Sequence, residues 1–139
     1  MEGFDLSTVD VKPRSQEGVE MQLLGPDRLP LPVWLRVRGT DSDAYQHKSE
    51  EIMARSLERA GRRQTQEEKN AEVWELQATL ICGWRPKLAL GKGQPAVEYS
   101  PENAQKLLRE HGYIFEQVHL FSRDRQNFLP GPASSSSGT

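Results

Sequence analysis

The sequence has one cysteine, three histidines and no long hydrophobic run. The single cysteine, Cys82, excludes a disulfide within the chain and an all-cysteine zinc site. No segment approaches the ~18 consecutive apolar residues of a membrane-spanning helix, so no membrane contact is expected. Residues 1–10 carry acidic side chains and lack the apolar stretch of a secretory signal. The sequence therefore predicts a protein of the reducing cytoplasm.

The chain also lacks an excess of charge of either sign. Its 139 residues include 18 basic and 20 acidic side chains, and the net charge of −2 gives no general attraction to nucleic acid. Hydrophobic residues make up only 35%, which favours one small core with unstructured ends. We expect a flexible N-terminal arm over residues 1–18, a single domain over 19–129 and a disordered Ser-rich tail over 130–139.

Few side chains carry the chemistry of an enzyme. His47, His111 and His119 are dispersed, and no nucleophile or third ligand accompanies them. His47 and Glu50 have helical spacing, but exposed helix faces commonly carry such pairs. Gly91-Lys92-Gly93 lacks the longer glycine spacing and the Lys-Ser/Thr ending of a phosphate loop, so it predicts a hairpin turn. We therefore expect no enzyme, no cofactor and no metal site.

The first half of the chain has the pattern of a β-hairpin followed by a helix. Apolar and polar residues alternate over 19–23 and over 33–38, and Gly25-Pro26-Asp27 between them is a turn signal. The segment 39–43 ends the second strand, and its Ser and Asp residues are suited to capping a helix. This pattern predicts a helix over residues 43–60.

The second half predicts three more helices and a small hairpin. The most apolar helix is expected over 67–83, central in the core, with Cys82 in it as a buried free thiol. A second hairpin is expected over 88–99, where two leucines, a glycine turn and Val97 follow one another. Ser100 followed by Pro101 marks the start of the next helix. The last helix is expected over 113–128. The fold class is α+β: small antiparallel hairpins packed against about four helices, with flexible tails.

Apolar residues occur on more than one side of the last predicted helix, more than a small core usually takes up. Some of them are therefore expected to contact a partner, although all of them could instead complete the core. The candidate contact residues on this helix are Ile114, Phe115, Val118, Phe121 and Phe128. Trp34 and Tyr45 are secondary candidates, because Trp34 lies on the strand face opposite the apolar alternation.

Residues 101–124 offer an alternative, a DNA-binding helix-turn-helix. The second helix would present Ile114, Glu116 and Leu120 to the groove, where base readers need Arg, Asn, Gln or Lys. The composition therefore argues against DNA binding.

Three ordered stretches resemble the small tail assembly chaperones of long-tailed bacteriophages. In residues 31–45, LPVWLRVRGTDSDAY, a strand leads through a Gly-x-Asp-Ser-Asp corner into a helix. In residues 80–104, LICGW is followed by a glycine turn and then by VEYSPENA. Residues 116–129 contain EQVH and end in DRQNFL. Lys92 departs from the acidic residue often found before the turn glycine, and the connector after Gly61 is unusually charged.

The resemblance implies a protein that is not an enzyme and needs no cofactor. Such chaperones bind the tape measure protein in the host cytoplasm, keep it soluble, help recruit tail tube subunits, and are absent from the mature virion. Many are also made in a frameshifted longer form, and self-association along the client is expected. No nucleic acid or membrane partner is implied. The alternatives are a structural virion protein, such as a tail terminator or head–tail joining subunit, and the helix-turn-helix protein considered above.

Overall fold

The computed structural model describes residues 3–59 and 63–131 and has the expected α+β class. Most of the Ser-rich tail lies outside the described residues, as do residues 60–62, which include the end of the helix expected over 43–60. The elements, in chain order, are η1 (Leu6–Val9), α1 (Lys12–Glu17), β1 (Val19–Leu24), β2 (Pro30–Val37), α2 (Asp43–Glu58), α3 (Gln66–Ala78), β3 (Ile81–Arg85), β4 (Leu88–Ala89), β5 (Ala96–Val97), α4 (Pro101–Glu110), α5 (Gly112–Arg123) and η2 (Arg125–Phe128).

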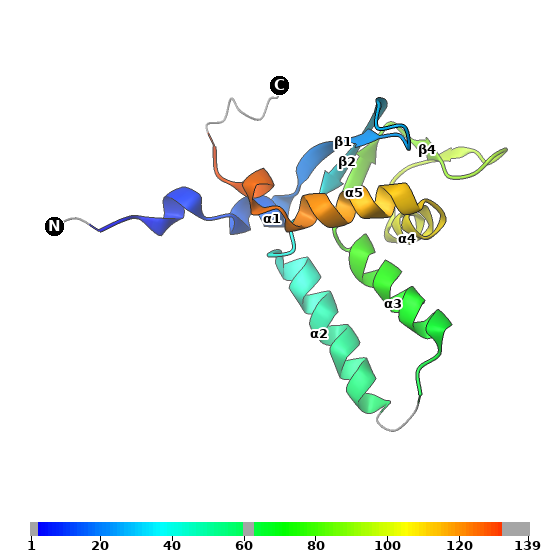
Figure 1. The fold of residues 1–139 in the computed structure, drawn as a ribbon, viewed down its shortest axis with the longest axis horizontal. Coiled ribbons are helices and arrows are strands. Elements are labelled where there is room, and N and C mark those ends of the chain that lie inside the picture. Colours follow the sequence, from blue (N-terminus) through cyan, green and yellow to red (C-terminus); the bar gives the residue numbers. More distant parts are fainter. Residues whose placement is uncertain (1–2, 60–62, 132–139) are drawn as a thin grey trace.

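An antiparallel sheet in the order β1-β2-β3 forms the centre of the molecule (Figure 1). The hairpin of β1 and β2 is the one that the alternation predicts, with Met21 opposite Leu35. The expected second hairpin is present as β4 and β5. Leu35 and Val37 are fully buried on one face of the sheet, whereas Arg36 points to the exposed face. This division follows from the two-residue period of a strand.

The prediction of one helix over residues 67–83 is wrong in its second half. Helix α3 ends at Ala78, and the Thr79 hydroxyl donates to the Leu76 carbonyl at 2.6 Å, which closes the last turn. The chain then enters β3, which pairs with the free edge of β2 and fully buries Ile81. Cys82 therefore lies half-buried in a strand, where desolvation raises the pKa of its thiol.

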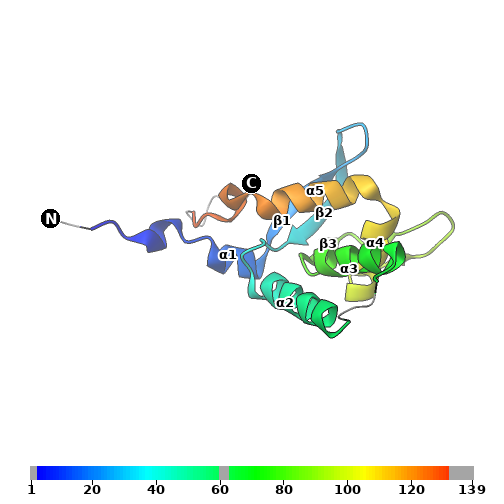
Figure 2. The ribbon, with the colours of Figure 1, turned by 60° about the horizontal axis from the view of Figure 1, so that its bottom comes forward.

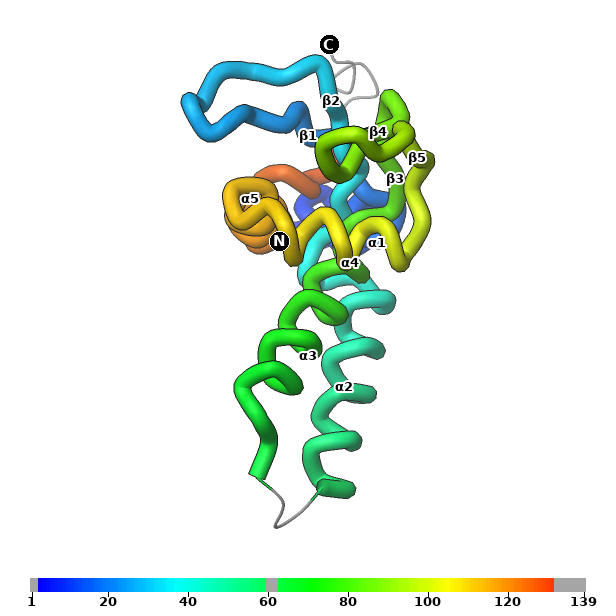
Figure 3. The backbone as a smooth tube through the Cα atoms, turned by 90° about the vertical axis from the view of Figure 1, so that its right-hand side faces the viewer, coloured from blue at the N-terminus to red at the C-terminus, as the bar shows by residue number. Residues whose placement is uncertain are grey.

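Helix α3 packs on α4 and α5 of the body, and α2 packs on α3. Helices α4 and α5 contact the sheet and enclose the core against it, and Figure 2 shows α5 running alongside β1 and β2. Helices α2 and α3 lie side by side and project away from the sheet (Figure 3). None of the sixteen residues of α2 is buried, so this helix contributes little to the core.

A corner between β2 and α2, residues 39–43, holds several segments together. The backbone N–H of Gly39 donates to the Ser15 carbonyl of α1 at 3.1 Å, and that of Thr40 donates to the Ser122 carbonyl of α5 at 3.0 Å. The Ser42 hydroxyl is buried and caps α2 by accepting from the Tyr45 N–H. The corner thus fixes α1, α2 and the end of α5 at one point.

The last predicted helix is also shorter than expected. Helix α5 ends at Arg123, and the Asp124 carboxylate accepts from the Gln126 N–H to cap the short helix η2. Arg125 of η2 then forms two hydrogen bonds with Asp41 of the corner, at 2.6 and 2.9 Å. The break in the helix turns Phe128 into the core, where it is 1% exposed.

Replacing Gly39 by alanine is expected to destabilise the fold. A Cβ at this position would lie 2.5 Å from the Ser15 hydroxyl and 3.3 Å from the Phe128 ring. Overpacking of this kind typically costs about 1–3 kcal/mol, which urea unfolding would measure. Adding Ser15→Ala should restore part of the loss. The control is Gly112→Ala, where a Cβ would meet nothing within 4 Å. Equal effects of the two glycine variants would contradict this account of the corner.

Candidate functional site

The structure divides the candidate contact residues of the last helix into two groups. Ile114, Val118 and Phe128 are 3%, 0% and 1% exposed, so they complete the core and present almost no surface to a partner. Phe115 and Phe121 are partly buried and pack against the edge of that core. Of the five, only these two remain on the surface, one on each side of α5.

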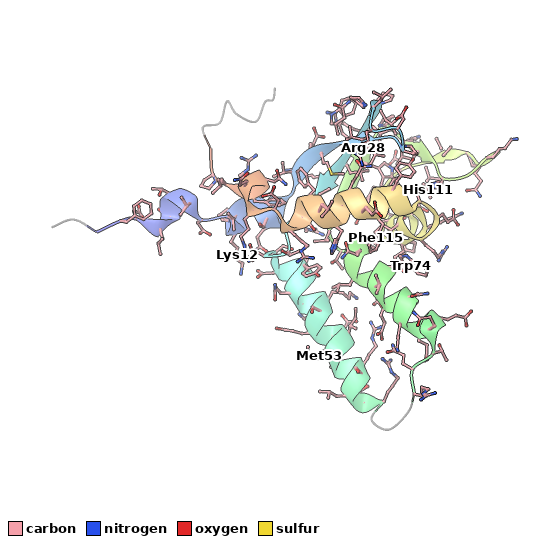
Figure 4. All side chains as sticks on the ribbon, in the orientation of Figure 1. Lys12, Arg28, Met53, Trp74, His111 and Phe115 are labelled. Atoms are coloured by element: carbon pink, nitrogen blue, oxygen red, sulfur yellow. The ribbon has the colours of Figure 1, made fainter. Side chains whose placement is uncertain are left out.

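Phe115 lines an apolar groove between α3, α4 and α5. The groove has a volume of about 450 Å³, and its apolar residues are Val73 and Trp74 from α3, Leu108 from α4 and Phe115. Figure 4 places Phe115 and Trp74 close together where α5 crosses α3. Val73 is 47% exposed. We call this feature the Trp74 groove.

Polar side chains surround the apolar part of the Trp74 groove. Arg109, Glu116 and Asn70 also line it, together with Gly112, so the lining carries charges of both signs. On α5, the ring of His119 stacks on that of Phe115 at 6.2 Å. His119 in turn contacts Arg123 through Nε2 at 3.0 Å. These contacts fix the Phe115 ring at the edge of the groove.

A second apolar groove lies between α5 and β1. It has a volume of about 370 Å³, and its apolar residues are Met21, Leu24, Leu120 and Phe121. Leu120 is 68% exposed. The Gln117 side chain joins the two elements, because it accepts from the Leu24 N–H at 2.9 Å and donates to the Leu24 carbonyl at 2.8 Å. We call this feature the Leu120 groove.

The sequence pattern did not point to Val73, Trp74 or Leu120 as surface residues. Val73 and Trp74 belong to the broad apolar face expected to be central in the core. Trp74 does pack against the core, whereas Val73 is 47% exposed. Leu120 is one of the surplus apolar residues of the last helix. The period of a helix shows which residues share a face but not which of two faces is covered.

The two secondary candidates are both partly covered. The guanidinium of Arg85 lies 4.4 Å from the centre of the Trp34 ring and also binds Glu20 at 2.9 and 3.0 Å. Trp34 is thus capped by its own chain on the exposed sheet face. Tyr45 packs against the edge of the core near the start of α2. Exposed apolar residues on α2 occur further along, at Met53 and Leu57.

The seam between α2 and α3 is held by charged side chains. Arg55 donates to both Glu75 oxygens, at 2.9 and 2.6 Å, and Lys48 binds the same carboxylate at 3.2 Å. Arg59 and Glu72 form a further pair at 3.1 Å. The bonds from Arg55 are the main reason that the pKa of Glu75 is lowered to about 2. Met53 and Leu57 of α2 and Val73 of α3 are exposed.

The residues suited to catalysis or to metal binding do not come together. Among residues 3–59 and 63–131, no group of three or more His, Cys, Asp and Glu side chains is placed to hold a metal ion. His47 and Glu50 are both exposed on α2. In the same part of the chain, no helix is long and apolar enough to cross a membrane. The candidate site is the pair of apolar grooves described above.

The exposed positions of α5 also bear on DNA binding. They are occupied by Gly112, Glu116, Leu120 and Arg123, which include one acid and one base. Base readers need several donors on such a face.

Comparison with protein families gives one match. A family described as YdaY prophage protein matches residues 40–133, which is most of the chain and runs from the corner through α5 and η2. The chain belongs to the YdaY prophage family. Membership establishes that it is a phage-related protein, as the resemblance implied, and the family's description names no activity or partner. No curated protein and no solved structure matches the chain.

The ionic seam predicts a pH-dependent contribution to stability. The pKa of Glu75 falls from 4.5 to about 2 on folding, so its stabilisation is complete above pH 4.5 and is lost as the pH falls towards 2. Glu75→Gln should lower the free energy of unfolding by about 1 kcal/mol at pH 7. The effect is modest because Arg55 is partly exposed, so solvent screens its attraction to Glu75. Urea unfolding at several pH values should show this difference shrinking below pH 4.5. A difference as large at pH 3 as at pH 7, or an equal effect of Glu50→Gln, would refute the assignment.

Burial predicts opposite outcomes for two apolar residues near the end of α5. Phe128→Ala should lower the free energy of unfolding by about 3–5 kcal/mol, because it leaves a cavity beside Phe121, whose ring lies 5.7 Å away. Leu120→Ala should change it by less than about 0.5 kcal/mol, because Leu120 is mostly exposed. Chemical denaturation followed by circular dichroism measures both. A mild effect of Phe128→Ala would mean that this residue is not part of the core.

Proposed function

We propose that this prophage protein is a tail assembly chaperone that binds the tape measure protein through the Trp74 groove. The tape measure protein is the client that the resemblance to tail assembly chaperones implies, and the Trp74 groove is the surface that could bind it. The observation that carries the proposal is an open apolar groove formed by three helices, with a half-exposed valine at its mouth.

The shape of the Trp74 groove suits an amphipathic helix. Helix-in-groove recognition places apolar side chains, three or four residues apart, between the helices of the receptor. Trp74, Leu108 and Phe115 provide such a floor, with ring faces and a leucine side chain. Arg109 and Glu116 at the rim can pair with charges of either sign beside the client's apolar stripe. A tape measure protein consists largely of long helices with apolar stripes, so it offers many such segments.

The remaining surface suits a protein that keeps a client soluble. Basic and acidic side chains are nearly balanced over the chain, and most of the exposed helix positions are polar. In the proposed role the protein has no catalytic activity and no cofactor, acts in the host cytoplasm, helps recruit tail tube subunits and is absent from the virion. Nucleic acid and membrane are not partners in this role. Several copies along one client would gain affinity from individually weak contacts.

Co-expression with the tape measure protein of the same prophage tests the proposal. The long protein should be soluble with the natural chain and should be largely insoluble with Val73→Glu, because a charge at the mouth of the groove opposes an apolar client. We expect at least about a tenfold loss of co-purified client, equivalent to about 1.4 kcal/mol. Val73 is half exposed, so the variant should keep its own fold and unfolding temperature.

The matched control is Leu57→Glu, an apolar-to-acid change at a residue that is 74% exposed on α2. It should retain client binding. Equal loss with both variants, or no loss with Val73→Glu, would reject the Trp74 groove as the binding site. A different pair of results would instead support a structural virion subunit: the client stays insoluble even with the natural chain, and this protein is found in purified virions.

A further inference from the structure

The N-terminal residues 3–11, which we call the extension, expose apolar side chains away from the body of the protein. Phe4 and Leu6 are each 73% exposed, and Val9 is 46% exposed. Figures 1 and 2 both show the extension leading away from the sheet and the long helices. Three large apolar residues within six positions, all in water, form a segment that gains free energy by being covered.

The extension has local order that presents these residues together. Its centre is η1, in which residues three apart lie on one face, so Leu6 and Val9 point the same way. The Asp5 carboxylate caps η1 by accepting from the Ser7 N–H at 3.0 Å, and the Thr8 hydroxyl donates to the Asp5 carbonyl at 2.8 Å. The extension therefore offers a preformed apolar face, which reduces the entropy cost of docking.

The start of α1 holds the extension in its outward direction. The Asp10 carboxylate accepts from the Lys12 N–H at 3.0 Å, and Pro13 restricts the backbone of the residue before it. Helix α1 is itself fixed, because Lys12 pairs with Asp43 at 2.9 Å and Arg14 donates to the Leu129 carbonyl at 3.1 Å. Folding the extension back onto its own body would require breaking contacts at this junction.

The Leu120 groove has the matching character. Leu120 is 68% exposed and Leu24 is 36% exposed, so both have apolar surface to cover. Asp124 also lines the groove, and its carboxylate accepts from the Gln126 N–H. The fit with the extension is therefore one of apolar contact, between Leu24 and Leu120 of the groove and the exposed apolar residues of the extension.

We propose that the extension of one copy docks in the Leu120 groove of a second copy, so that two copies exchange their extensions reciprocally. Helix α1, where the extension begins, contacts η2, and Asn127 of η2 lines one end of the groove. The exit of each extension is therefore near the receiving groove, the arrangement that lets two copies exchange segments around a two-fold axis. Exchange leaves the Trp74 groove on the other side of α5 open. The inference does not depend on client binding.

Site-specific crosslinking tests the exchange in the full chain. In a Cys82→Ser background, one chain carries Leu6→Cys and a second, size-tagged chain carries Leu120→Cys. Mixed and oxidised, they should give a disulfide-linked heterodimer on a non-reducing gel. The control replaces the second chain by one with Leu57→Cys, which is similarly exposed on α2. The crosslinked yield should be about tenfold higher with Leu120→Cys, because docking raises the local concentration of the two thiols.

Sedimentation of the natural chain should show a dimer that becomes a monomer when Leu6 and Val9 are both replaced by Asp. Three outcomes would overturn the proposal. The natural chain could be a monomer at all concentrations, Leu6→Cys could crosslink equally to Leu120→Cys and Leu57→Cys, or the disulfide could form only when both cysteines are in the same chain. Val73→Glu, which tests client binding, should leave the dimer intact. Loss of client binding and loss of self-association are therefore separate outcomes.

Discussion

The corner after β2 joins several parts of the fold: Gly39 and Ser42 are buried in it, and the surface pair of Asp41 with Arg125 adds a link to the last turn of the chain. The two hydrogen bonds, at 2.6 and 2.9 Å, hold η2 against residues 39–43. The same corner accepts α1 by close approach at Gly39 and begins α2 at the buried cap of Ser42. Segments more than eighty residues apart in sequence are thus fixed together, and the direction in which the extension leaves the body is set at the same place.

Helix α5 accounts for the division between core and surface. Ile114 and Val118 lie under the helix and are buried, while Phe115 and Leu120 emerge on opposite flanks. One helix therefore stabilises the body and borders two apolar grooves. This explains why its sequence is apolar on more than one side. Two separate grooves also allow a client and a second copy to be held at once.

Local signals predicted most of the elements. Ser100 with Pro101 begins α4 as expected, and the alternation over residues 19–23 and 33–38 gives the first hairpin. The errors occur where tertiary contacts decide between two local possibilities. The apolar run after Ala78 fits a helix as well as a strand, and only the free edge of β2 selects the strand. The grooves could not be foreseen, because which apolar residues stay exposed depends on how α3 and α5 are placed. The roles of Phe115, Phe121, Trp34 and Tyr45 in binding stay predictions.

The ionic seam has a consequence for how the two parts of the molecule respond to salt. Attraction between partly exposed charges weakens as dissolved ions screen it, over a distance of about 8 Å at physiological ionic strength and about 3 Å at 1 M. Apolar burial in the body is not weakened in this way. Added salt therefore loosens α2 from α3 while the sheet and α5 stay packed. The Trp74 groove does not share this sensitivity, because α3, α4 and α5 form it and α3 also contacts α4 and α5 directly.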